Sequence, residues 1–173
     1  MALEQTSPAH KQAALQMKQE FFDAGEHIIN GSALLDQMEF EPWLRQTYQN
    51  YHRETVSPNW CRATVFFAVR KTDGRMIGVL DVRHELTTDF LREYGGNIGY
   101  AVRPSERKKG YASQMLRLAL KYCQSLSIKS ARLGCYADNI ASIRTIEKCG
   151  GIQVEQKRYT NGKPMLVYEV PCK

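Results

Sequence analysis

A short strand, a basic loop and an amphipathic helix follow one another within residues 97–126, and this arrangement constrains the fold more than any other feature of the sequence. Apolar residues alternate from Ile98 to Val102 as in a strand, and those after Gly110 recur at helical spacing. The loop between them, residues 103–109, contains four basic residues and one acidic residue. The first turn of a helix presents free backbone N–H groups and a partial positive charge. The sequence therefore predicts an anion site, suited to phosphate, at the start of this helix.

The glycines of this loop follow neither of the common nucleotide-binding patterns, Gly-x4-Gly-Lys-Ser/Thr and Gly-x-Gly-x-x-Gly. An ordinary solvated loop is the alternative, because basic loops ahead of helices are common. The small residues Gly110 and Ala112 favour the anion site, since they let a ligand approach the backbone closely.

The length of 173 residues predicts one domain. The net charge of +6, from 24 basic and 18 acidic residues, raises the alternative of a nucleic-acid-binding domain. Aromatic side chains do not interleave with the basic loop, however, as a stacking platform requires. The longest nearly apolar run, residues 63–69, is too short to span a membrane, and the N-terminus lacks the features of a signal peptide. We therefore expect a cytoplasmic protein without a membrane or nucleic-acid partner.

The five cysteines form no CxxC pair and are odd in number. This pattern fits neither a disulfide framework nor a zinc site, so we expect reduced, mostly buried thiols and no metal. A covalent route through Cys135 or Cys149 is an alternative, although no Cys-His-Asp order supports it.

The order of the expected elements predicts an α+β fold with three layers, α/β/α: a single mixed, mostly antiparallel β-sheet flanked by helices. Helices are expected from Ser7-Pro8, after Pro42, after Gly110 and over residues 139–148. Strands are expected over residues 63–70, 76–83, 97–102, 131–135, 152–159 and 165–170. Asn161-Gly162 predicts a hairpin between the last two. We treat residues 1–173 as one domain, in which helices of residues 1–60 shape the acceptor side and residues 61–173 form the sheet and the cofactor-binding core.

Two segments resemble motifs of the GCN5-related N-acetyltransferases. Arg107-Lys108-Lys109-Gly110-Tyr111-Ala112 is similar to the Arg/Gln-x-x-Gly-x-Gly/Ala motif of that family. Asn139-Ile140-Ala141-Ser142, followed by Glu147-Lys148-Cys149-Gly150, is similar to its Asn-x-x-Ala/Ser…Glu-Lys-x-Gly segment. Residues 83–86 and 95–100 look like a subgroup known mainly as predicted acetyltransferases. The resemblance covers most of the chain. It implies the acyl-CoA N-acyltransferase fold and direct transfer of an acetyl group from acetyl-CoA to an amine in a ternary complex.

The resemblance also implies where acetyl-CoA binds. The amides that should cradle its pyrophosphate belong to Arg107, Lys108, Lys109, Gly110, Tyr111, Ala112 and Ser113. The backbone of Tyr100, Ala101 and Val102 should pair with the pantetheine arm like an added strand, which requires strands 97–102 and 131–136 to diverge. Asn139 and Ser142 would meet the other side of the cofactor. A helix cap is the alternative role of Asn139, and both roles are compatible.

Acetyl transfer needs a base to deprotonate the amine and a donor for the tetrahedral oxyanion. By resemblance the donor is the backbone N–H of Val102, or of its neighbour Ala101. For the base we favour Glu85, then His84, with Asp81 and Glu93 as further candidates; a solvated or structural role is the alternative for each.

The family often uses a Tyr to protonate the leaving thiolate, and this sequence has Ile146 at that position. Tyr136 and Tyr111 are candidate substitutes, and a thiolate also leaves without an acid. Gly151 likewise replaces the family Phe.

The acceptor is expected to be a small-molecule amine or a peptide amine. The only assembly that we consider for the protein is a homodimer. Aromatic and acidic residues that suit a cationic amine precede the sheet: Phe21, Phe22, Glu26, Trp43, Tyr48, Tyr51 and Trp60. Core packing is the alternative role for most of them. Because the family Tyr is missing, a non-catalytic acyl-CoA-binding or sensor module remains the alternative function.

Overall fold

The computed structural model describes residues 1–173. Its helices and strands are β1 (Ala2–Gln5), α1 (Lys11–Asp23), α2 (Phe40–Tyr51), β2 (Ala63–Val69), β3 (Met76–Arg83), β4 (Ile98–Val102), α3 (Tyr111–Ser125), β5 (Ser130–Tyr136), α4 (Ile140–Lys148), β6 (Ile152–Arg158) and β7 (Pro164–Pro171). Three shorter helical turns are η1 (Pro8–His10), η2 (Leu91–Gly95) and η3 (Pro104–Glu106). No helix has the length and apolar character that crossing a membrane requires.

The strands form two hydrogen-bonded sheets, where the sequence predicted a single one. The first has the order β1-β2-β3-β4 and the second the order β5-β7-β6, with antiparallel neighbours throughout. Between β4 and β5 only one isolated bridge joins Gly96 to Leu133. Next to this bridge, Asn97 N–H donates to Arg132 O at 2.6 Å, but Arg132 N–H donates to the Asn97 side chain at 2.9 Å in place of a backbone carbonyl. The regular ladder does not continue beyond this point. The α+β class is confirmed, and so is the expected divergence of strands 97–102 and 131–136.

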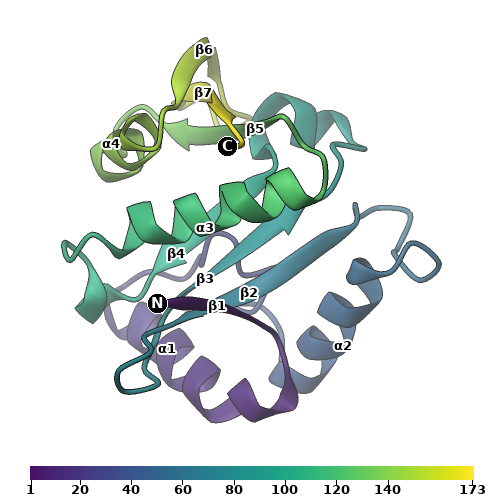
Figure 1. The fold of residues 1–173 in the computed structure, drawn as a ribbon, viewed down its shortest axis with the longest axis vertical. Helices are drawn as coiled ribbons and strands as arrows, with labels where there is room; N and C mark the ends of the chain where they lie inside the picture. The colour runs from purple at the N-terminus through teal and green to yellow at the C-terminus, as the bar shows by residue number, and fades with distance from the viewer.

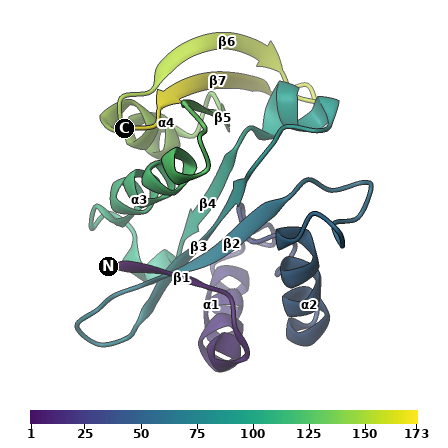
Figure 2. The same ribbon diagram turned by 45° about the vertical axis from the view of Figure 1, so that its right-hand side comes forward.

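Helices cover both faces of the four-stranded sheet (Figure 1), and each face has its own core. Val65 and Phe67 face a cluster of 12 buried residues under α1 and α2. Phe66 and Ala68, which alternate with them, face a cluster of 18 buried residues that includes the inner side of α3. This second cluster continues into β5 and β7, so it holds the two sheets together although their strands separate (Figure 2).

The N-terminal 60 residues contain a strand that the sequence did not reveal. β1 pairs with β2, with Ala2 opposite Val69 and Gln5 opposite Phe66. The second helix also begins earlier than predicted, at Phe40 rather than after Pro42. Proline is tolerated there because the N–H groups of a first turn have no partner within the helix.

Candidate active site

Six consecutive backbone N–H groups at the start of α3 have no acceptor within the protein, those of residues 108–113. Gly110 precedes the helix in a left-handed conformation with φ +80°, and Lys108 is left-handed as well, with φ +60°. Left-handed turns of this kind gather N–H groups into an anion-binding concavity, and strained non-glycine residues such as Lys108 cluster at ligand sites. A Cβ on Gly110 would meet nothing within 4 Å, so the space before the helix is open. The backbone therefore fits a phosphate ligand.

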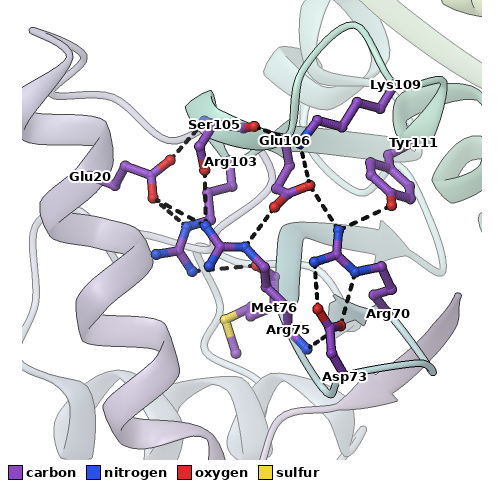
Figure 3. A network of polar contacts seen from close by, with 10 residues as sticks. All are labelled: Glu20, Arg70, Asp73, Arg75, Met76, Arg103, Ser105, Glu106, Lys109 and Tyr111. Carbon is purple, nitrogen blue, oxygen red and sulfur yellow. Dashed lines mark hydrogen bonds and ion pairs between the residues drawn. The ribbon is translucent and has the colours of Figure 1, made fainter.

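Three of the four basic side chains of the same loop are directed to carboxylates, and Figure 3 shows one part of this network. Arg103 Nε donates to Glu20 at 2.5 Å, and Ser105 N–H donates to the other oxygen of Glu20 at 2.7 Å. Lys109 Nζ donates to Glu106 at 3.0 Å.

Arg107 is also engaged inside the protein. Its guanidinium makes two bonds to Glu26, at 2.5 and 2.8 Å, and lies 5.6 Å from the centre of the Phe21 ring. Of the loop's four basic residues, only Lys108 lacks a carboxylate partner. The sequence analysis treated the basic side chains of the whole loop as available to a phosphate. The structure corrects this, because α1 and the segment after it supply two balancing carboxylates.

β4 presents unpaired backbone groups to the gap between the sheets. Arg103 N–H donates to Ile77 O at 2.8 Å, which fixes the alternation of the β3–β4 ladder. By this alternation the N–H groups of Tyr100 and Val102 point away from β3, and neither has an acceptor. Val102 O accepts a bond from Arg107 Nε at 3.0 Å. The gap thus offers the free N–H of Val102 that an oxyanion donor requires, while its carbonyl is already engaged.

α4 approaches the same gap from the second sheet. The hydroxyl groups of Tyr100 and Ser142 lie 3.1 Å apart and link β4 to α4. Burial raises the pKa of Tyr100 to about 12, so the phenol keeps its proton at neutral pH. Asn139 caps α4, since its side-chain oxygen accepts from Ser142 N–H at 3.1 Å. The two polar residues that the sequence placed at the cofactor therefore lie together at the N-terminus of α4.

A comparison of the sequence with known protein families agrees with this geometry. The model of the acetyltransferase (GNAT) domain family matches residues 8–152, which is most of the chain. The chain belongs to the GNAT acetyltransferase family. Among curated proteins, none matches the sequence.

Solved structures with the same GNAT fold cover almost the whole chain. A spermidine N-acetyltransferase SpeG variant from Vibrio cholerae is 14% identical, with a TM-score of 0.68 over 99% of this chain and 95% of its own. RimL, a ribosomal L7/L12 alpha-N-protein acetyltransferase in complex with coenzyme A, is 19% identical, with a TM-score of 0.68 over 98% and 92%. The yncA protein from Salmonella typhimurium, solved with acetyl-CoA, is 13% identical, with a TM-score of 0.65 over 99% and 94%.

The candidate bases lie at different places along the sheet of this GNAT domain. His84 follows β3 at the end opposite the basic loop, whereas Val102 faces Gly78 near the beginning of β3. At about 3.3 Å per residue, His84 and Val102 are roughly 20 Å apart along the strands. They do not act on one reacting atom in this arrangement.

His84 belongs to a polar chain of its own. Its Nε2 lies 2.8 Å from the Thr64 hydroxyl, which lies 2.8 Å from the Tyr122 hydroxyl. Burial, and then the charge of Arg62, lower the pKa of His84, so the ring is neutral at pH 7. Its Nδ1 is buried without a partner.

Asp81 is the carboxylate that contacts β4. It is 5% exposed, and its Oδ1 accepts from Gly99 N–H at 3.1 Å. Arg83 Nε lies 3.0 Å from its other oxygen. Glu85 is exposed and has no hydrogen-bond partner, and Glu93 is exposed and pairs with Lys157.

The tyrosines named as substitutes for the family acid have other contacts. Tyr136 Oη accepts from Asn161 at 3.1 Å, at the β6–β7 turn. Tyr111 Oη accepts from Arg70 at 3.2 Å and points toward the β2–β3 hairpin (Figure 3). Ile146 is 1% exposed within the core. A Cβ on Gly151 would lie 2.4 Å from the Ile146 side chain, so the two departures from the family pattern contact each other.

The cysteines of the GNAT domain do not form an alternative nucleophilic site. All five are free, and burial raises the pKa of both Cys135 and Cys149. Reactive thiols instead have lowered pKa values and accessible positions. No group of three or more His, Cys, Asp or Glu residues is arranged to hold a metal ion.

Proposed function

We propose that this GNAT acetyltransferase binds acetyl-CoA with its pyrophosphate on the free amides of residues 108–113 and transfers the acetyl group directly to an amine. The observation that carries the proposal is the run of unpaired N–H groups at α3, continued by those of Tyr100 and Val102 along β4. Together they offer an anion cradle and a free strand edge, which are what a pyrophosphate and an amide-bearing pantetheine arm require.

In the proposed reaction the acceptor nitrogen attacks the thioester carbonyl carbon. A C–N bond forms, the tetrahedral oxyanion accepts a hydrogen bond from Val102 N–H, and the C–S bond then breaks. Before the attack, the ammonium, with a pKa of about 10 in water, loses its proton to the base. The departing coenzyme A thiolate takes up a proton from solvent or from Tyr136, and the base returns its proton to solvent. Burial raises the pKa of Tyr100 to about 12, which makes its phenol too weak an acid for this step.

Asp81 becomes our first candidate for the base, ahead of Glu85 and His84. Its carboxylate contacts Gly99, the residue before Tyr100 on β4, whereas Glu85 lies in solvent beyond the end of β3. Asp81 lies opposite Gly99, three residues or about 10 Å along the strand from Val102. We therefore propose that the proton passes through a short chain of water molecules rather than directly. Tyr136 stays our proposed acid for the leaving thiolate, and its hydroxyl contacts Asn161 in this structure.

We propose a cationic small-molecule or peptide amine as the acceptor, and the cytoplasm as the location. SpeG acts on spermidine and RimL on a ribosomal protein, both of which provide amines. The five free thiols agree with a reducing compartment. A homodimer remains a proposal that only a measured mass would establish.

The test is an acetylation screen in which coenzyme A release and the product mass are followed. Polyamines and short peptides with free N-termini serve as acceptors. With an active acceptor, Asp81→Asn should lower kcat at least about tenfold at neutral pH, whereas the exposed control Glu85→Gln should change it less than about twofold. The reverse ranking would restore Glu85 as the base. Tight acetyl-CoA binding without turnover against the whole panel would favour the non-catalytic sensor.

A further inference from the structure

The β2–β3 hairpin and the basic loop of residues 103–109 meet at one buried carboxylate, that of Glu106 in η3. This residue is 4% exposed, although it lies directly before Arg107. Arg75 Nε lies 2.6 Å from its Oε1, and its Oε2 accepts from Arg70 Nη1 and from Lys109 Nζ, both at 3.0 Å. Three cations thus surround one carboxylate, and two of them come from the hairpin (Figure 3).

The same two arginines hold the chain on both sides of the left-handed turn at residues 108–110. Before the turn, Arg75 Nη2 donates to Ser105 Oγ at 3.1 Å. After it, Arg70 Nη1 donates to Tyr111 Oη at 3.2 Å. The carboxylate that contacts both arginines therefore links the two anchors of the turn.

The turn between these anchors needs support from outside itself. Lys108 has φ +60°, a strained conformation for a lysine. The N–H groups of residues 108–110 have no acceptor in the protein, so they do not hold this conformation. Lys109, within the turn, reaches back to Ser105 O at 3.0 Å and to Glu106. Because a strained conformation persists only where its surroundings fix it, the contacts around Glu106 are the support that the hairpin provides.

Glu106 carries its charge at neutral pH. Burial raises its pKa, but the bond from Lys109 and the charges of Arg70 and Lys109 lower it below its usual range. Without this charge Lys109 has no other carboxylate partner, and Arg75 keeps only Glu20, at 4.0 Å. Neutralising Glu106 would therefore loosen the turn from the hairpin.

We propose that Glu106 is a positioning residue for coenzyme binding, which holds the turn so that the amides of residues 108–113 converge on the pyrophosphate. This rests on the proposed function, because those amides are assigned there to acetyl-CoA. Glu106 itself faces three cations and almost no solvent, so it acts through the loop and does not touch the ligand.

The test is a double-mutant cycle in which acetyl-CoA affinity is measured by calorimetry. Glu106→Gln keeps the shape of the side chain and removes its charge, and it should weaken binding about tenfold. Lys108→Asn relieves the strain of the turn, because asparagine tolerates the left-handed region. In the Lys108→Asn background, Glu106→Gln should therefore weaken binding by no more than about threefold.

The matched control is Glu155→Gln. Glu155 also bridges two cations, Arg132 and Lys157, but it lies on β6. Its replacement should leave acetyl-CoA affinity within about twofold. Arg75→Gln leaves Glu106 with two cations and should weaken binding about threefold, which keeps the inference testable if Glu106→Gln folds poorly.

Unchanged affinity in folded Glu106→Gln or Arg75→Gln would overturn the inference and leave the proposed function standing. So would an equal loss from Glu106→Gln in both backgrounds, because Glu106 would then not act through the turn. Tighter binding by Glu106→Gln would contradict the inference as well, since a released Lys109 would then reach the phosphates. Absence of acetyl-CoA binding by the wild type would overturn the proposed function itself.

Discussion

The loop of residues 103–109 and the hollow that Arg117, Lys121 and Lys173 line beside α3 are both rich in basic residues. They differ in whether these side chains have acidic partners. In the loop, Arg103 and Arg107 pair with Glu20 and Glu26, so the free donors there are backbone N–H groups and the side chain of Lys108. On α3, Arg117 and its neighbours have no acidic partner, and the side chains themselves are the free donors. A charge count along the sequence does not distinguish these cases. The partners decide which groups remain for a ligand.

The largest expected effect comes from distorting the amides of the loop. Gly110→Val places a β-branched residue at φ +80°, which costs about 1–3 kcal/mol and moves the neighbouring N–H groups. We expect acetyl-CoA affinity, measured by calorimetry, to fall at least about tenfold. Gly162→Val is the matched control, since Gly162 has φ +81° and equally open space in the β6–β7 turn. Equal losses of acetyl-CoA affinity in the two variants would contradict a role of the loop amides in binding.

A smaller effect is expected from a variant that tests whether the Arg107 side chain contributes to acetyl-CoA binding. Glu26→Gln removes a half-exposed ion pair worth about 1 kcal/mol, so thermal unfolding should shift down by about 2–4 °C. Acetyl-CoA affinity should stay within about twofold, because the guanidinium is not assigned to the phosphates. Glu54→Gln, an exposed carboxylate without a partner, serves as the control for charge removal. Markedly tighter binding by Glu26→Gln would mean that a released Arg107 reaches the phosphates.

The smallest effect is a pH dependence of stability that arises in the same loop. Burial alone would raise the pKa of Glu20, but the bonds from Ser105 and Arg103 lower it from 4.5 to about 2. A carboxyl whose pKa is depressed by folding stabilises the protein above the unfolded pKa, and this stability is lost as the pH falls toward 2. Because the Glu20 side chain is partly exposed, solvent screens the pair and we expect a contribution below about 1 kcal/mol.

Denaturant titrations between pH 6 and pH 3 measure that contribution. The wild type should lose more stability across this range than Glu20→Gln, which lacks the titrating group. Identical slopes for the two proteins would contradict the assigned contacts of Glu20.

The sequence predicted those parts of the site that depend on local pattern. The strand of residues 98–102, the loop and α3 follow from alternation, charge and helical spacing, and the Asn161-Gly162 hairpin follows from turn chemistry. The partners of the loop could not be predicted, since Glu20 lies 83 residues from Arg103 and Glu26 lies 81 residues from Arg107. Only the packing of α1 beside the sheet brings them together.

The division into two sheets was only partly predictable from the sequence, again because it depends on contacts between distant residues. Divergence of the strands followed from the family resemblance, whereas the end of the pairing depends on the bonds of Asn97 to Arg132. β1 escaped prediction because its four residues are partly or fully exposed, so they show no buried alternation. Asp81 was named from the sequence, but its contact with Gly99 depends on the register of β3 and β4.

The central claim is that free backbone amides, rather than the loop's paired side chains, hold the phosphates of acetyl-CoA. Amide chemical shifts of the ¹⁵N-labelled protein, recorded while acetyl-CoA is added, test it most directly. We predict the largest shifts at residues 108–113, with further shifts at Tyr100 and Val102, while the side-chain Nε signals of Arg103 and Arg107 change little. Large changes at those Nε signals with unaltered amides at residues 108–113 would contradict the account.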